Sequence, residues 1–226
     1  MCVCLIGLWT PAVQGLAASE LNALSAVVME ASTDRILYEK NAYEERAIAS
    51  TTKIMTLIVA LEEGNEEEIA TVSELAASQP KVKMGMTAGE QYRLKDMPLK
   101  ALIHAMLLPS GCDAAYTVAV GVGRDVGGAG LSDEAAVQVF CDLMNQKARE
   151  IGALHTQFKT PNGLDAEGHY STAADMARIL AYAMQNEEFC EIVNTESYTM
   201  STADGNSRSA TAHNHNPLLG TFEGTN

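Results

Sequence analysis

The stretch from Ala49 to Glu62 reads ASTTKIMTLIVALE, and the interpretation of the whole chain starts from it. After Lys53 it is almost entirely apolar and free of glycine and proline, which predicts a buried helix. Ser50 falls where that helix begins and Lys53 follows one turn later, so the two side chains share a helix face. An amine in an apolar wall loses hydration, which lowers its pKa and lets it accept the proton of a hydroxyl. Ser50 and Lys53 are therefore a candidate nucleophile and base.

The Ser-x-x-Lys spacing is a weak signal when it stands alone. Both residue types are common, so about one such motif is expected by chance in a chain of this length. In the alternative interpretation, Ser50 caps the helix and Lys53 extends its charged end along apolar surface to water.

The composition is that of an ordinary globular protein. The chain has 226 residues, of which 47% are hydrophobic and 19% charged, and this predicts one domain. Lys and Arg number 15 against 29 Asp and Glu, a net charge of −14 with no basic patch, which excludes nucleic acid as a partner. No Cys/His grouping has metal-ligand spacing, and the glycines at 121–130 do not follow a strand, so neither a metal nor a cofactor is expected.

Residues 1–18 differ from the rest of the chain. They carry no charge, contain the apolar run 3–9 and end in small residues. This pattern predicts the remnant of a secretory signal peptide, cleaved near Ala17 or Ala18, and hence an exported protein. The basic n-region is missing, so we expect the true start to lie upstream. The segment is too short for a membrane span, and Pro11 weakens that alternative further.

Cysteine usage gives little sign of disulfides. Cys2 and Cys4 would leave with the signal peptide, and Cys112, Cys141 and Cys190 would remain, an odd number without Cys-x-x-Cys spacing. A disulfide framework is not expected, and a single disulfide bridge is the alternative.

Hydrophobic patterning predicts a mixture of helices and strands. Strand-like runs at 25–30 and 35–39, joined by turn residues, predict a β-hairpin. Expected helices and strands follow from caps, breakers and periodicity. They are a helix over 99–108 stopped by Pro109, a helix over 114–122 capped by Asp113, a helix from Ser132 to Ile151 ended by Gly152, a helix after Ser171, and a strand over 196–200 with a turn at 203–206. Residues 75–92 are expected as loops and short strands, 121–130 as a flexible connection and 160–165 as a turn.

Ser110-Gly111-Cys112 is a second candidate element. It forms a tight connector after Pro109. A serine on such a connector can project into a cleft, hydrogen-bond both Ser50 and Lys53, and relay a proton to a leaving group. The alternative is a simple turn between helices.

Three segments occur in a fixed order along the chain. They are STTK at 50–53, LLPSGCDAA at 107–115 and TPNGLDAEGHYSTAADMA at 160–177. Together they resemble the serine-type D-alanyl-D-alanine carboxypeptidases, the low-molecular-mass penicillin-binding proteins. The resemblance spans about residues 24–226, and its third segment is the most specific.

The resemblance implies a fold and a mechanism. The fold is α/β (α+β), that of penicillin-binding proteins and β-lactamases, with a helical region packed on an antiparallel sheet, and residues 19–226 form the catalytic domain. Ser50 would attack the carbonyl between the terminal D-alanines of a peptidoglycan stem peptide, Lys53 would take its proton, and Ser110 would deliver one to the leaving D-alanine. Cys112 and His169 would border the bound substrate, β-lactams would acylate Ser50, and the enzyme would act in the extracytoplasmic envelope of a bacterium.

The chain departs from the family pattern at two places. Asn usually stands two residues after the relay serine, where this chain has Cys112, a weaker hydrogen-bonding group. The third motif, Lys-Thr-Gly on an edge strand, does not occur, although residues 214–226 resemble the segment that leads into it. We therefore expect a fragment with an incomplete sheet, which by itself reacts poorly. Membrane attachment through a missing C-terminal segment stays open.

Two alternative functions follow from these departures. A β-lactamase on the same scaffold needs a positioned carboxylate for deacylation, but residues 163–165 resemble the carboxypeptidases instead. A non-catalytic peptidoglycan-binding homologue would fit Cys112 and the missing motif. His213 and His215 are expected to be ordinary residues near the site.

Overall fold

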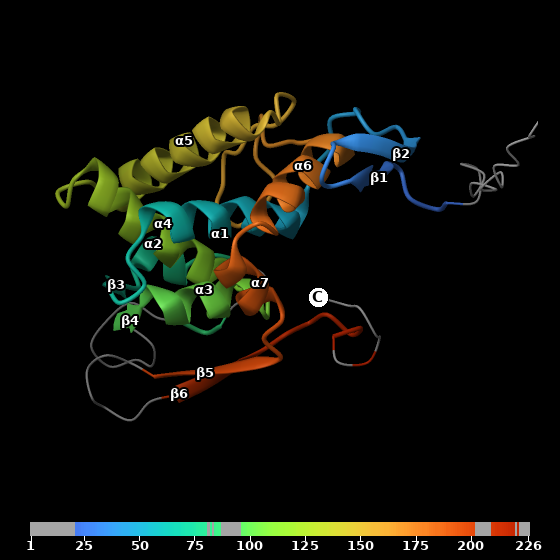
Figure 1. The fold of residues 1–226 in the computed structure, drawn as a ribbon. Helices are drawn as coiled ribbons and strands as arrows, with labels where there is room; N and C mark the ends of the chain where they lie inside the picture. The colour runs from blue at the N-terminus through green and yellow to red at the C-terminus, as the bar shows by residue number, and fades with distance from the viewer. Residues whose placement is uncertain are drawn as a thin grey trace, which may run out of the picture.

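The computed structural model describes residues 21–80, 82, 84–86, 96–201, 209–219 and 221. A group of helices makes up most of this part, and short antiparallel ribbons lie around it (Figure 1). The elements in chain order are β1 Ala26–Glu30, β2 Arg35–Lys40, the 3-10 turn η2 Ala49–Thr51, α1 Thr52–Glu63, β3 Ile69–Thr71, α2 Glu74–Ala77, β4 Asp96–Pro98, α3 Leu99–Leu107, α4 Cys112–Gly127, α5 Asp133–Ile151, α6 Ala173–Ala183, α7 Glu187–Val193, β5 Ser197–Ser201 and β6 Ser209–His213.

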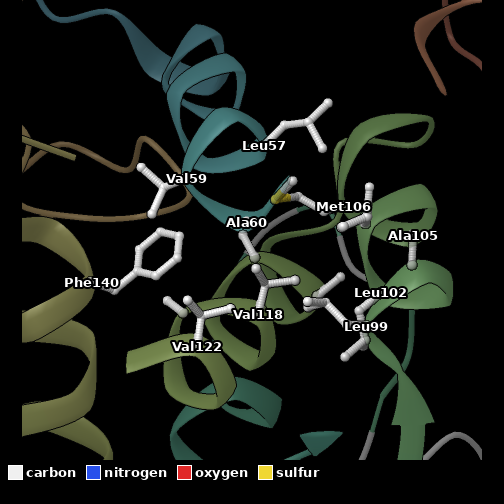
Figure 2. Packing of buried hydrophobic residues seen from close by; sticks show 14 of the residues in the cluster. Leu57, Val59, Ala60, Leu99, Leu102, Ala105, Met106, Val118, Val122 and Phe140 are labelled. Carbon is white, nitrogen blue, oxygen red and sulfur yellow. The ribbon is translucent and has the colours of Figure 1, made fainter. Parts of the chain in front are cut away.

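Helix α1 is the centre of the core. Eight of its residues are buried, so the predicted buried helix is confirmed. It contacts α3, α4, α5 and α6, and Figure 2 shows side chains from α1, α3, α4 and α5 meeting at one place, with Phe140 of α5 beside Val59 and Ala60. Because close-packed interiors resist displacement, α1 is a rigid support for the side chains in its first turn.

Helices α4 and α5 cross closely at a glycine. A Cβ added at Gly123 would lie 2.1 Å from the carbonyl oxygen of Ala136, so no other residue fits there without moving a helix. The prediction that 121–130 is a flexible connection is therefore wrong for its first part, since α4 continues to Gly127. Glycine weakens a helix, but here it allows two backbones to approach.

Several predicted helix ends are confirmed. Helix α3 ends at Leu107, shortly before Pro109. Ser132 Oγ accepts a hydrogen bond from the backbone N–H of Ala135 at 3.2 Å and caps α5. Gly152 ends α5 in the left-handed conformation, with φ +87°.

One predicted cap is wrong. Helix α4 begins at Cys112, so Asp113 lies in its first turn instead of capping it. The Asp113 carboxylate is instead buried and accepts hydrogen bonds from the backbone N–H groups of Met84 and Met86, which anchors the preceding loop. Helix α6 begins at Ala173 and is capped by Thr172, so the helix predicted after Ser171 is confirmed.

The strands form three separate two-stranded antiparallel ribbons among the described residues. The predicted hairpin of β1 and β2 and the strand at 196–200 are confirmed. The single sheet that we expected is not formed, because no described strand joins β1–β2 to β5–β6. These two ribbons pack on different helices, β1 on α6 and β5 on α3 (Figure 1).

Some predictions lie partly or wholly outside the described residues. These are the signal peptide at 1–18, the turn at 203–206 and, within 75–92, residues 81, 83 and 87–92. In the described part of that range, residues 75–77 belong to α2 instead of a loop or strand. Cys112, Cys141 and Cys190 are free thiols. Within the described ranges, no helix is both long and apolar enough to cross a membrane.

Candidate active site

Ser50 and Lys53 face each other at the start of α1. Ser50 lies in the 3-10 turn that leads into the helix, and Lys53 lies in the first helical turn. Lys53 Nζ is 3.1 Å from Ser50 Oγ, within hydrogen-bonding distance. The Ser50 side chain is exposed, whereas Lys53 is only 2% exposed.

The structural alternative for this pair is not supported. Neither the 3-10 turn nor α1 has a side-chain capping hydrogen bond at its N-terminus, so Ser50 does not act as a cap. Lys53 does not reach water along the surface, because it is buried. A buried amine beside an exposed hydroxyl is instead the arrangement that nucleophilic catalysis needs.

Burial sets the charge state of the amine. Desolvation lowers the pKa of Lys53 below its ordinary value, and Cys112 has a smaller effect in the opposite direction. No carboxylate among the described residues forms a salt bridge with Lys53 that would stabilise its charged form. The neutral amine is therefore favoured more than in an exposed lysine.

The backbone carbonyl of Asn162 orients this amine. Lys53 Nζ donates a hydrogen bond to Asn162 O at 2.7 Å. A neutral amine has two N–H bonds and one lone pair. With one N–H directed at Asn162, the lone pair is available to the hydroxyl proton of Ser50.

The loop that carries Asn162 packs against α1 and the residue before Ser50. Thr56 Oγ1 donates to the carbonyl of Pro161 at 2.6 Å. Gly163 has φ +82°, and a Cβ there would lie 1.8 Å from the carbonyl oxygen of Ala49. Within the turn predicted at 160–165 the structure has a bend at 161–162, and this loop touches the segment that holds Ser50.

His169 is held within the protein by both ring nitrogens. The backbone N–H of Lys159 donates to Nδ1 at 3.0 Å, so Nε2 carries the hydrogen and donates to Thr52 Oγ1 at 2.9 Å. Burial lowers the pKa of His169, with a smaller opposing effect of Asp165, and the ring is 5% exposed. These contacts tie the 159–169 loop to α1, and the predicted contact of His169 with substrate stays a prediction.

The connector from α3 to α4 brings Cys112 to the amine. Cys112 Sγ is 3.9 Å from Lys53 Nζ, and the residue is 4% exposed. Ser110 is half-buried with φ +62°. The hydrogen bonds expected from Ser110 to Ser50 and Lys53 are not among those of the described residues, so its role as proton relay stays a prediction. Among the described residues, the thiol of Cys112 is the connector group within hydrogen-bonding distance of the amine.

Sequence reasoning missed Thr52, Thr56 and the carbonyl of Asn162. Thr52 lies inside the Ser-x-x-Lys motif and Asn162 inside the segment 160–177. The motifs therefore include both positions, but they do not indicate what either residue does. A backbone carbonyl has no sequence signature, and only the fold brings it to the amine.

Comparison with known sequences agrees with this geometry. A sequence model of the family described as D-alanyl-D-alanine carboxypeptidase, peptidase family S11, matches residues 12–224. The chain belongs to this family. The predicted family is thereby confirmed.

Relatives in this family come from several bacteria. The chain is 34% identical to the D-alanyl-D-alanine carboxypeptidase DacF of Bacillus subtilis, over 84% of this chain and 47% of that protein. It is 33% identical to the D-alanyl-D-alanine carboxypeptidase of Streptomyces sp. K15, over 89% of this chain and 69% of that one. The match to DacA of Escherichia coli, also 33% identical, covers 71% and 38%. The chain thus spans half or less of the length of the Bacillus and Escherichia relatives.

A solved structure confirms the α+β fold. The crystal structure of the Streptomyces K15 DD-transpeptidase matches with a TM-score of 0.77 and 31% identity, over 89% of this chain and 77% of that one. Solved variants of that enzyme replace a serine and a cysteine two positions apart. Ser110 and Cys112 of this chain have the same spacing.

Proposed function

We propose that the protein is a serine D-alanyl-D-alanine carboxypeptidase, which removes the terminal D-alanine from peptidoglycan stem peptides. The observation that carries this proposal is the buried amine of Lys53, 3.1 Å from the exposed hydroxyl of Ser50. Membership of the S11 family supplies the substrate class, a peptide that ends in D-Ala-D-Ala.

Acylation begins at Ser50. Its oxygen attacks the carbonyl carbon between the two D-alanines while Lys53 Nζ accepts the hydroxyl proton. The tetrahedral intermediate then collapses, the peptide C–N bond breaks, and the departing nitrogen takes up a proton. Ser110 relays that proton from Lys53. The products are free D-alanine and an ester between Ser50 and the shortened stem peptide.

Deacylation completes the cycle. Water attacks the ester carbonyl and gives its proton to Lys53, which is neutral again after the first step. The C–O bond to Ser50 breaks, and Ser50 regains a proton. β-Lactams enter by the same first step, and their acyl group stays on Ser50 because the opened ring remains attached to it.

Release of D-alanine tests the proposal. The full-length protein is incubated with a stem pentapeptide ending in D-Ala-D-Ala, and free D-alanine is measured. Ser50→Ala should reduce the rate at least ~1,000-fold, since loss of a nucleophile removes the covalent route. Ser197→Ala changes an exposed serine on β5 and should keep the wild-type rate. Release that persists in Ser50→Ala would refute the assignment.

Transpeptidation is a second candidate function. The observation that favours it is the Ser110–Cys112 spacing, shared with an enzyme known as the Streptomyces K15 DD-transpeptidase. A transpeptidase passes the acyl group to an amine instead of water. Adding glycine as acceptor to the assay separates the two functions, because a transpeptidase forms an amide to glycine at the expense of the hydrolysed product.

The two remaining alternatives give different results in the same experiments. Binding of the stem peptide without release of D-alanine would identify a non-catalytic homologue. Rapid turnover of penicillin would identify a β-lactamase.

We infer from family membership that the enzyme acts outside the cytoplasm, at the bacterial cell wall. We infer that residues 1–18 direct export and are removed near Ala17 or Ala18. Mass spectrometry of the protein recovered from the envelope fraction tests this, and a mature form that retains residues 1–18 would contradict it.

A further inference from the structure

We propose that Gln79 positions the base Lys53, acting through Asn162. The inference rests on the proposed function, since it assigns a residue to the same active site. Gln79 lies just after α2 and on a different part of the chain from the three quoted motifs.

The amide of Gln79 has a defined orientation. Its Oε1 accepts a hydrogen bond from Asn162 Nδ2 at 3.2 Å, and its Nε2 donates to the carbonyl of Leu75 at 3.1 Å. Gln79 is 8% exposed and Asn162 1% exposed. Because each amide end has a partner of the opposite kind, the side chain cannot turn over without losing both bonds.

Asn162 transmits this constraint to the amine. Its side-chain Oδ1 accepts from the backbone N–H of Leu164 at 3.0 Å, and its backbone carbonyl accepts from Lys53 Nζ at 2.7 Å. The side chain is therefore held at both ends, and the carbonyl points at the base. Without Gln79, a buried amide N–H of Asn162 would lose its partner, which is unfavourable enough to shift the loop toward another acceptor or water.

The fold of this loop does not depend on Gln79. Thr56 binds the carbonyl of Pro161, and Gly163 packs against Ala49. These two contacts fasten the loop to α1 and to the nucleophile turn. The hydrogen bond between Gln79 and Asn162 fixes the orientation of Asn162, which lies between Pro161 and Gly163. Asn162 in turn supplies the backbone carbonyl that binds Lys53.

Gln79→Met is the variant that tests this role. Methionine keeps the length and volume of the side chain but cannot accept from Asn162. We expect the rate constant of acylation by a fluorescent penicillin to fall roughly tenfold in the full-length protein, while the melting temperature changes by only a few degrees. An unchanged acylation rate would overturn the proposal.

Gln185→Ala is the matched control. Gln185 also bonds the carbonyl four residues before it, with Nε2 3.4 Å from Ala181 O, but it is exposed and has no link to Asn162. Its acylation rate should equal that of the wild type. A fall as large as in Gln79→Met would mean that the loss is not specific to Gln79.

A double-mutant cycle separates positioning from general support. If Gln79 acts through the Asn162 side chain, Gln79→Met should slow acylation no further in an Asn162→Ala background. Multiplicative losses would show that Gln79 acts by another route, and the proposal would fail.

A crystal structure of Gln79→Met gives a readout that does not need activity. The distance from Lys53 Nζ to Asn162 O should exceed 3.5 Å, against 2.7 Å in the wild type. If the contact is retained, Gln79 is not a positioning residue. Failure of wild-type acylation would instead refute the proposed function, and the crystal structures would still decide the role of Gln79.

Discussion

The side-chain amine of Lys53 lies 2.7 Å from the backbone carbonyl oxygen of Asn162, although the two residues are 109 positions apart in the chain. This contact joins the first turn of α1 to the loop before α6. It also fixes one N–H of the amine, so that the lone pair of the neutral form can face Ser50. Different parts of the fold thus act on the amine: burial on α1 favours its neutral form, and the 160–164 loop sets its direction.

The acylation rate should rise with pH through the lowered pKa of Lys53. At low pH the amine is protonated and cannot accept the Ser50 proton, and at high pH it is neutral and can. Because burial lowers this pKa, the midpoint should lie below the ordinary lysine value of 10.5. The measurement is the penicillin acylation rate of the full-length protein across the pH range in which it stays folded. A midpoint at or above 10.5, or a rate that falls with pH, would contradict the proposed role of Lys53 as base.

Lys53→Met should abolish acylation without a comparable loss of stability. The folded protein binds the Lys53 proton less tightly than the unfolded chain. Wild-type stability therefore rises with pH between the lowered pKa and 10.5. Below that window the buried amine is charged in both states and destabilises the folded protein to its full extent. The variant lacks this destabilising charge but leaves the Asn162 carbonyl without its donor. We therefore expect the free energy of unfolding to change by no more than about 1 kcal/mol near neutral pH.

Urea unfolding at several pH values measures this effect. The stability of the wild type minus that of Lys53→Met should increase as pH rises toward 10.5. Lys100→Met is the control, because Lys100 is exposed and the hydrogen bond to Glu66 raises its pKa. The stability of the wild type minus that of Lys100→Met should therefore not increase as pH rises toward 10.5. A Lys53 difference that is flat or decreases with pH would show that the amine is not desolvated in the folded state.

Gly163→Ala should damage both stability and activity. The residue has φ +82°, and a Cβ would lie 1.8 Å from the carbonyl oxygen of Ala49, next to Ser50. Backbone strain and the forced movement together should cost about 2–4 kcal/mol, and acylation should slow because Ser50 is displaced.

Gly152→Ala provides the comparison for this substitution. Gly152 has a similar φ of +87°, but nothing lies within 4 Å of an added Cβ. It should therefore cost only about 1 kcal/mol and leave acylation unchanged. Equal effects of the two substitutions, measured by urea unfolding and penicillin acylation, would show that the contact of Gly163 with Ala49 is unimportant.

Much of the fold could be predicted because its signals are local. The apolar run after Lys53, the stop at Pro109, the Ser132 cap and the turn residues of the first hairpin each act within a few residues. Gly123 misled the prediction, because it allows a close approach between α4 and α5 that depends on residues elsewhere. Asp113 has a similar explanation, since its partners are backbone groups of a distant loop.

The candidate site was predictable only in part for the same reason. The spacing of Ser50 and Lys53 on one helix face is a local property, and the structure places them together. The connector lies near the amine through the thiol of Cys112, while the role of Ser110 as proton relay stays a prediction. The contributions of Asn162 and Gln79 depend on a carbonyl direction and on a contact between residues 83 positions apart, and no pattern in the sequence specifies either.

The most direct test of the central claim is to find which atom a β-lactam acylates. The full-length protein is treated with a fluorescent penicillin, digested, and the labelled peptide is sequenced by mass spectrometry. We predict a single adduct on Ser50, absent in Ser50→Ala and in Lys53→Met. An adduct on Cys112 or on any other residue, or labelling that persists in Ser50→Ala, would contradict the account of a serine nucleophile activated by a buried, neutral lysine.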